Sequence, residues 1–162
     1  MKKISLFLGL IILSFNCITC SNDNSTLPED YWIKVRVDPT VELFCTIHRL
    51  AKTGVDDTHE LPNYIRDIEN YFAPFGNHRA VNKAKELWET HHINISALST
   101  LVVYLGDPPE LIPLNQLDPL PSELDARWTV DVIPEFIEAA REFSRDSEYM
   151  VFFDSQKQLF DR

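Results

Sequence analysis

The sequence predicts a mainly α-helical fold: five to six amphipathic helices in an irregular bundle, one N-terminal β-strand, and a proline-rich extended crossing at residues 106–121. Three observations predict it. Apolar residues recur at helical spacing in several segments after residue 39. Capping residues or prolines stand in front of most of these segments. Apolar and basic residues alternate at 32–37, which is the pattern of a half-buried strand.

Residues 1–20 have the build of a bacterial lipoprotein signal peptide. Two lysines precede an apolar run at 4–13, which is shorter than the about 20 residues of a spanning helix. We expect lipidation at Cys20, with the polar residues 21–31 as a flexible tether. An anchor with more than one acyl chain holds a protein stably on a membrane. The expected location is the cell envelope, periplasmic or outer-membrane surface; cleavage without lipidation would give a secreted protein.

Residues 32–162 would form one helical domain, and the limits of its first helix are predicted from local chemistry. Asp38 supplies a capping side chain, and Pro39 fits the first helical position, where its missing N–H costs nothing. An apolar stripe runs from there to Ala51. Gly54 is expected to end the helix.

Three more helices are predicted in the same way. A second helix spans about 62–72. Asn77 would cap a third helix that runs to His91, and Asn94 would cap a shorter fourth helix that reaches Leu105. The fourth is apolar on nearly every side, so we expect it to be buried on several faces.

The crossing at 106–121 contains five prolines, which disfavour a regular element. Its leucines and Ile112 are expected to pin it to the helical core. A fifth helix would begin with Thr129 or Asp131 as its cap, and Ser147 would cap a final, aromatic-rich segment.

Charge excludes one class of partner. The formal net charge is −10; without residues 1–20, which hold two of the 15 basic residues and none of the 25 acidic ones, it is −12. Such a surface repels phosphate backbones, so we expect no nucleic-acid partner. Cys45 stands among apolar residues, where a buried, unreactive thiol is expected.

The residues predict no catalytic, cofactor-binding or metal site. His59-Glu60 begins a zinc-protease motif, but Asn63 stands where its second histidine belongs, and Pro62 would break the helix. The other histidines are expected to be structural or solvated: His48, His78, His91 and His92.

One set of short stretches resembles a known family. The stretches are Val37-Asp38-Pro39-Thr40-Val41-Glu42-Leu43, Ile47-His48-Arg49-Leu50-Ala51, Asn70-Tyr71-Phe72, Asn77-His78-Arg79-Ala80-Val81, Ile95-Ser96-Ala97-Leu98, Arg127-Trp128 and Phe143-Ser144-Arg145-Asp146-Ser147. In order and spacing they resemble exported bacterial proteins of the family named domain of unknown function 4932, common in the Bacteroidetes. The resemblance covers about residues 32–162.

The resemblance implies that this chain is the N-terminal part of a zinc-peptidase-like protein without its catalytic half. Members of the family are longer, and their later half carries a His-Glu helix. No catalytic or metal residue carries over to this chain, and zinc would belong to the full-length protein. The missing half, or another envelope protein, would be a partner.

Two other interpretations stay open. In the first, the chain is a self-contained surface module that binds protein or glycan through exposed aromatic residues: Trp32, Trp88 and Trp128. Such a module should bury its apolar end, which a partial domain would leave largely exposed: Phe152, Phe153, Leu159 and Phe160. An enzyme within this chain would need a metal site built from histidines: His48, His59, His78 or His91.

Overall fold

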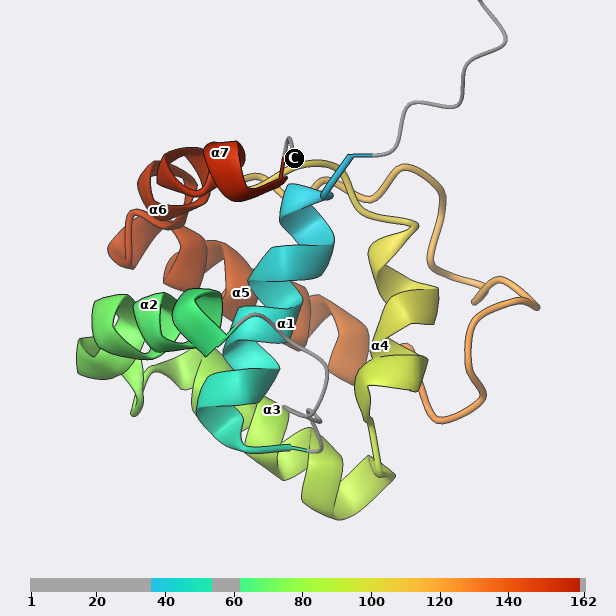
Figure 1. Cartoon of the computed structure of the whole chain (residues 1–162). Coiled ribbons are helices and arrows are strands. Elements are labelled where there is room, and N and C mark those ends of the chain that lie inside the picture. Colours follow the sequence, from blue (N-terminus) through green and yellow to red (C-terminus); the bar gives the residue numbers. More distant parts are fainter. Residues whose placement is uncertain (1–35, 54–61, 161–162) are drawn as a thin grey trace, which may run out of the picture. The chain divides into compact units, whose positions relative to one another are not determined.

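The computed structural model describes residues 36–53 and 62–160. Its helices are α1 (Pro39–Ala51), α2 (Pro62–Phe72), the 3-10 turn η3 (Ala73–Phe75), α3 (Arg79–His91), α4 (Ile95–Val102), α5 (Val132–Asp146), α6 (Tyr149–Ser155) and α7 (Lys157–Phe160) (Figure 1). The described ranges contain no strand, and the predicted mainly helical fold is confirmed. The strand expected at 32–37 lies outside the described residues except for 36 and 37, which have no regular structure; the expected signal at 1–20 and tether at 21–31 lie outside them entirely.

Helix α1 begins as predicted and ends earlier. The Asp38 carboxylate accepts hydrogen bonds from the backbone N–H groups of Thr40 and Val41, at 2.9 and 3.2 Å. The prediction that Gly54 ends the helix is wrong, because Lys52 already takes a left-handed conformation with φ 57°. The N–H groups of Lys52 and Thr53 then turn back to carbonyls of the last turn, which completes the helix end without a glycine.

The other helix limits follow the predictions closely. Helix α2 spans the predicted range, and Asn94 caps α4 by accepting from the N–H of Ala97 at 3.1 Å. The cap of α3 is His78 rather than Asn77, since its Nδ1 accepts from the N–H of Ala80 at 3.1 Å. Helix α4 ends at Val102, short of the predicted Leu105.

The start of the last segment differs from the prediction. Ser147 does not cap α6, because its hydroxyl donates back to the carbonyl of Phe143 at 2.6 Å. Glu148 takes the cap position instead, in a left-handed conformation with φ 51° and no side-chain capping bond. Phe152 and Phe153 are buried, Leu159 is half-buried, and the side chain of Phe160 lies outside the described residues.

The segment 106–121 forms no helix or strand, as predicted. It opens with a short antiparallel bridge, in which the N–H of Gly106 donates to the carbonyl of Ile112 at 2.8 Å. Leu111 is fully buried and pins the segment to the core. The expectation for Ile112 is wrong: Ile112 and Leu114 are 61% and 63% exposed. The carbonyl of Ile112 and the N–H of Leu114 are bonded to Gly106 and Tyr104, so backbone bonds and not these side chains hold the segment here.

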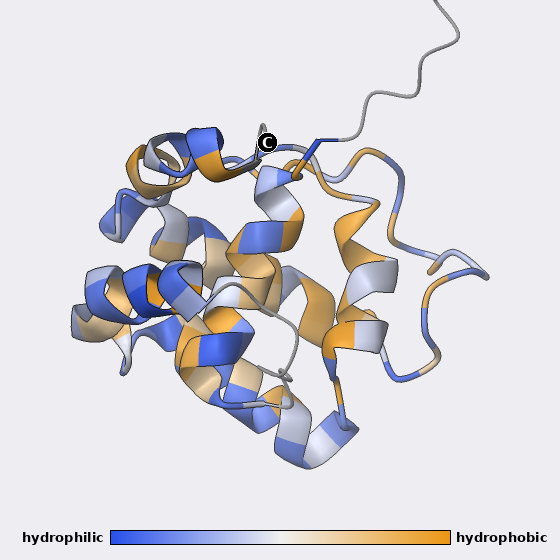
Figure 2. Cartoon of the chain, viewed as in Figure 1, coloured by the Kyte–Doolittle hydropathy of each residue, from blue (hydrophilic) through white to orange (hydrophobic). Residues whose placement is uncertain are grey.

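Helix α1 occupies the middle of the described bundle and contacts α2, α3, α4, α5 and α6 (Figure 1). Apolar colour in Figure 2 lies on the sides of helices that face one another and covers much of α4. Two groups of aromatic rings fill the core. One surrounds Phe136, which meets Phe44 at a centroid distance of 5.3 Å. The other surrounds Phe72, which meets Phe143 at 5.7 Å and Phe152 at 4.9 Å.

His48 is a titratable polar side chain in this core. His48 on α1 is fully buried and packs edge-on against Phe136, with ring centroids 6.0 Å apart. Its Nδ1 shares a hydrogen bond of 2.8 Å with the hydroxyl of Thr53, and among the described residues its Nε2 has no hydrogen-bond partner. Burial lowers the pKa of His48 to about 4, against the smaller opposing effect of its hydrogen bond with Thr53. The ring is therefore neutral near pH 7.

This burial predicts a pH dependence of stability. The pKa of His48 in the unfolded chain is about 6.5, above its folded value, so the unfolded state binds the proton first as pH falls. The contribution to the free energy of unfolding, about 3 kcal/mol, is complete above pH 6.5 and is lost as pH falls from 6.5 to 4. Urea unfolding at several pH values should show a smaller loss in His48→Asn than in the wild type.

His92→Asn is the matched control for this series. His92 is exposed, and asparagine tolerates its left-handed backbone with φ 55°. The control should keep the full wild-type pH dependence. An identical slope in His48→Asn and the wild type between pH 6.5 and 4 would disprove the assignment to His48.

Candidate functional site

The structure separates the aromatic residues proposed for surface binding. Trp88 on α3 is exposed to 37%. Trp128 is exposed to only 2%, so its assignment as a surface binding residue is wrong. Trp32, like the lipidation residue Cys20, lies outside the described residues.

Trp128 is buried because both halves of its indole find partners in the core. Its Nε1–H donates to the carbonyl of Ala97 at 2.8 Å. Its ring stacks on Phe136 at a centroid distance of 6.1 Å. A tryptophan whose N–H is satisfied inside the protein contributes to packing, and Trp128 joins the start of α5 to α4.

Apart from the adjacent His91 and His92 at the end of α3, the histidines within the described residues lie on separate parts of the fold. His48 is in the core, His78 caps α3 and meets Asp146 at 3.2 Å, and His91 shares a hydrogen bond of 2.7 Å with Thr90. His59 lies outside the described residues. Within residues 36–53 and 62–160, no three His, Cys, Asp or Glu side chains come close enough to hold a metal ion.

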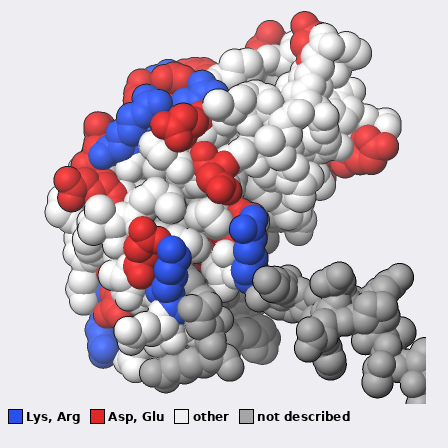
Figure 3. Space-filling model, turned by 90° about the horizontal axis from the view of Figure 1, so that it is seen from above, with Lys and Arg blue, Asp and Glu red and all other residues white. Residues whose placement is uncertain are grey.

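Several charged side chains on the described surface form ion pairs. On the face seen in Figure 3, basic side chains lie beside acidic ones. Between α3 and α5, Lys83 meets Glu135 at 2.8 Å and Glu86 at 3.0 Å. Burial lowers the pKa of Lys83, but its hydrogen bonds to Glu135 and Glu86 outweigh burial and raise that pKa overall. The ion pair of Lys83 with Glu135 joins α3 to α5.

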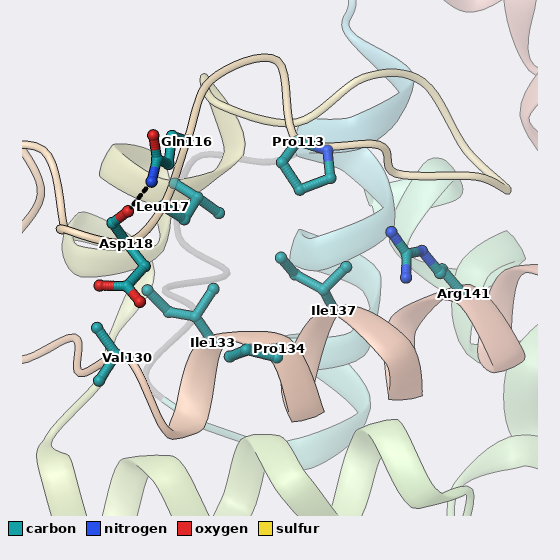
Figure 4. Close-up of a pocket in the computed structure, with 9 residues that line it drawn as sticks. All are labelled: Pro113, Gln116, Leu117, Asp118, Val130, Ile133, Pro134, Ile137 and Arg141. Carbon is teal, nitrogen blue, oxygen red and sulfur yellow. Dashed lines mark hydrogen bonds between the residues drawn. The ribbon is translucent and has the colours of Figure 1, made fainter.

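One cavity lies between α5 and the proline-rich segment. We call it the α5 pocket; it has a volume of about 400 Å³. Its lining residues are Pro113, Gln116, Leu117, Asp118, Val130, Ile133, Pro134, Ile137 and Arg141 (Figure 4). Six of these nine are apolar, and a volume of this size is within the range of small-molecule sites.

The two sides of the α5 pocket come from different kinds of structure. Ile133 and Ile137 stand one helical turn apart on α5 and point toward the opposite segment in Figure 4. Leu117 reaches toward them from that segment. Val130, just before the helix, is exposed to 46% and lies at the pocket's edge. The pocket therefore has a rigid helical floor and an extended wall.

Arg141 fixes that wall to the helix. Its guanidinium donates to the carbonyls of Glu110 and Leu111, at 2.6 and 3.2 Å, and to the Glu138 carboxylate at 2.8 Å. The hydrogen bond from Arg141 lowers the pKa of Glu138, so this carboxylate stays ionised at neutral pH. One side chain thus holds two backbone carbonyls of the wall in place.

Sequence reasoning placed the segment 106–121 across the core but did not predict the cavity beneath it. The five prolines were the one signal in the sequence that this region packs incompletely. The distance between wall and floor depends on Arg141, whose hydrogen bonds join residues 30 and 31 positions apart. No local pattern reveals such a pairing.

Comparison of the whole chain with family models, curated proteins and solved structures gave no match in any of the three. The resemblance to domain of unknown function 4932 therefore stays a prediction. None of the helices in the described ranges is long and apolar enough to cross a membrane.

Removal of the Arg141 guanidinium should loosen the pocket wall. In Arg141→Met the carbonyls of Glu110 and Leu111 lose a charged donor, and a bond of that kind contributes about 1.5–3 kcal/mol. The N–H groups of Leu111 and Leu114, which donate to the carbonyls of Asp107 and Tyr104, should exchange with solvent at least about tenfold faster. Amide hydrogen exchange followed by NMR measures this effect.

Arg66→Met serves as the control, because the side chain of exposed Arg66 on α2 bonds only the nearby Asn63 side chain among the described residues, at 3.1 Å. It should leave exchange in the segment unchanged. Equal exchange rates in wild type and Arg141→Met would show that Arg141 does not secure the wall.

Proposed function

We propose that this chain is an exported, lipid-anchored binding domain that holds a small, mainly apolar ligand in the α5 pocket. The observation that carries the proposal is the pocket itself: about 400 Å³ of space with six apolar lining residues. A cavity of this kind with a few polar groups at its edge is the usual form of a small-molecule site. The location rests on the signal-like residues 1–20 and on Cys20 as the lipidation site.

The chemistry of the lining supports binding rather than catalysis. The nine lining residues include no serine, cysteine, histidine, lysine or tyrosine, which are the usual nucleophiles and proton-transfer groups. Asp118 is the only carboxylate among them, and Arg141 is engaged with two carbonyls and a carboxylate. A ligand placed there would meet apolar contact and one ionic group.

Burial of Phe152 and Phe153 also supports the binding-module interpretation, for which this packing was expected. Their rings contribute to the core near Phe72 and Tyr149, with Phe72–Phe152 centroids 4.9 Å apart. The interpretation as the N-terminal part of a zinc-peptidase-like protein remains a prediction. It rests on the resemblance of the short stretches between residues 37 and 147.

A neutral apolar probe tests the pocket. Methyl NMR of Ile133 and Ile137 should show saturable shifts on addition of 1-hexanol, because both side chains line the cavity. Val130→Glu should weaken this binding about fivefold or more, since a charge at the edge of an apolar pocket disfavours an apolar ligand. The control is Val151→Glu on α6, where Val151 is 62% exposed and outside the pocket lining.

Wild-type affinity in Val151→Glu together with the loss in Val130→Glu is the expected result. Equal binding of hexanol by Val130→Glu and the wild type, or no saturable shift in the wild type, would refute ligand binding in the α5 pocket.

The anchor is tested separately in a bacterial host. The wild type should incorporate labelled palmitate and sediment with membranes, whereas Cys20→Ala should do neither, because the acylated sulfur is absent. Cys17→Ala should behave like the wild type. Release by Cys17→Ala instead of Cys20→Ala would move the lipidation site, and membrane association in both variants would refute the anchor.

A further inference from the structure

We infer that the α5 pocket selects ligands with an apolar body and one cationic group, and that Asp118 is the residue that recognises the cation. The inference rests on the proposed binding function and adds the chemical class of the ligand. The inference follows from a difference between the two charged groups of the pocket: Arg141 is already hydrogen-bonded, and the Asp118 carboxylate is available.

The positive charge at the pocket is engaged. Arg141 donates to the carbonyls of Glu110 and Leu111 and to the carboxylate of Glu138, at 2.6–3.2 Å. These bonds use Nε and both terminal nitrogens of the guanidinium. An anionic ligand would therefore have to compete with Glu138, and it would draw Arg141 away from the carbonyls that hold the wall.

The negative charge at the pocket is available. The Asp118 carboxylate makes no hydrogen bond or ion pair with the described residues, and Asp118 is exposed. Its backbone carbonyl accepts a hydrogen bond from the side-chain amide of Gln116, another lining residue (Figure 4). Figure 4 shows the carboxylate on the side of the pocket where Val130 and Ile133 lie. A cation on a ligand seated over Ile133 would be near this carboxylate.

The electrostatic field around the pocket is negative, like the charge of Asp118. The chain carries a formal net charge of −10, and exposed Asp131 follows Val130 directly at the pocket's edge. An acidic surface raises the local concentration of cations and disfavours anions. Apolar burial over Ile133 and Ile137 would supply most of the affinity, and Asp118 would supply the preference among charge types.

A series with one carbon chain and three head groups tests this inference. The probes are n-hexylamine, 1-hexanol and hexanoate at pH 7, titrated into the full mature domain and followed by the methyl signals of Ile133 and Ile137. We expect the amine to bind about threefold to fivefold more tightly than the alcohol, which is the range of a solvent-exposed ion pair. Hexanoate should bind more weakly than the alcohol.

Asp118→Asn should abolish the preference for the amine, so that the amine and the alcohol bind this variant with equal affinity. Glu89→Gln on α3 removes the same charge from an exposed residue outside the pocket lining and should keep the preference for the amine. In the wild type that preference should also shrink as salt rises from about 0.05 M to about 0.5 M, since an exposed pair is screened.

The outcomes distinguish the two levels of the proposal. Hexanol binding with an undiminished amine preference in Asp118→Asn would overturn the role of Asp118 and leave the pocket as a binding site. Equal affinity for amine and alcohol in the wild type would overturn the cation preference. Absence of saturable shifts with every probe would overturn the binding function itself.

Discussion

The burial of α1 at the centre of the bundle is the constraint on which the rest of the described structure depends. Its first turn holds distant parts of the chain through polar bonds: the carbonyl of Pro39 accepts from the Tyr149 hydroxyl at 2.9 Å, and the Thr40 hydroxyl donates to the carbonyl of Gly106 at 3.2 Å. Burial raises the pKa of Tyr149 far above its usual value, so this hydroxyl stays a donor. Farther along α1, the ring of Phe44 packs on that of Phe136 at a centroid distance of 5.3 Å, and this contact positions α5 against α1. The last segment, the proline-rich crossing and the pocket floor are all positioned from this one helix.

The α5 pocket forms because burial of Leu111 and the stiffness of the prolines place opposing demands on the crossing segment. Leu111 must be buried, which draws the crossing segment onto the bundle, while the prolines keep the segment extended and unable to follow the surface of α5. Arg141 resolves the conflict at one end by bonding two carbonyls of the segment. Past this point, Leu117 reaches toward Ile133 and Ile137 but is only half-buried, and the segment crosses over a cavity. A tighter crossing would close the cavity, and a looser one would expose Leu111.

Local chemistry allowed most helices to be predicted from sequence, and tertiary contacts explain the failures. Asp38-Pro39 and Asn94 are capping signals that act within three residues, so the starts of α1 and α4 were accessible. Lys52 ends α1 and Glu148 precedes α6, both with positive φ. Lysine and glutamate rarely take this conformation, so the sequence gives no sign of it. Trp128 was misassigned because its partners, Ala97 and Phe136, are fixed by the fold and not by spacing. The pocket was missed for the same reason, since Arg141 and Glu110 meet only after α5 and the crossing segment have been positioned.

Affinity and selectivity have separate origins in such a pocket. Ile133 and Ile137 are almost fully buried and belong to the core, so their positions are determined by the same packing that stabilises α5. A ligand above them gains from apolar contact, a force that has no direction and does not distinguish one head group from another. Asp118 is exposed and is attached to the wall, so it adds little to the fold. A charge in that position changes which ligand is preferred without changing the cavity, and selectivity can therefore vary while the helical floor stays the same. For this reason, the chemical identity of residue 118 carries more information about the ligand than the much larger apolar surface below it.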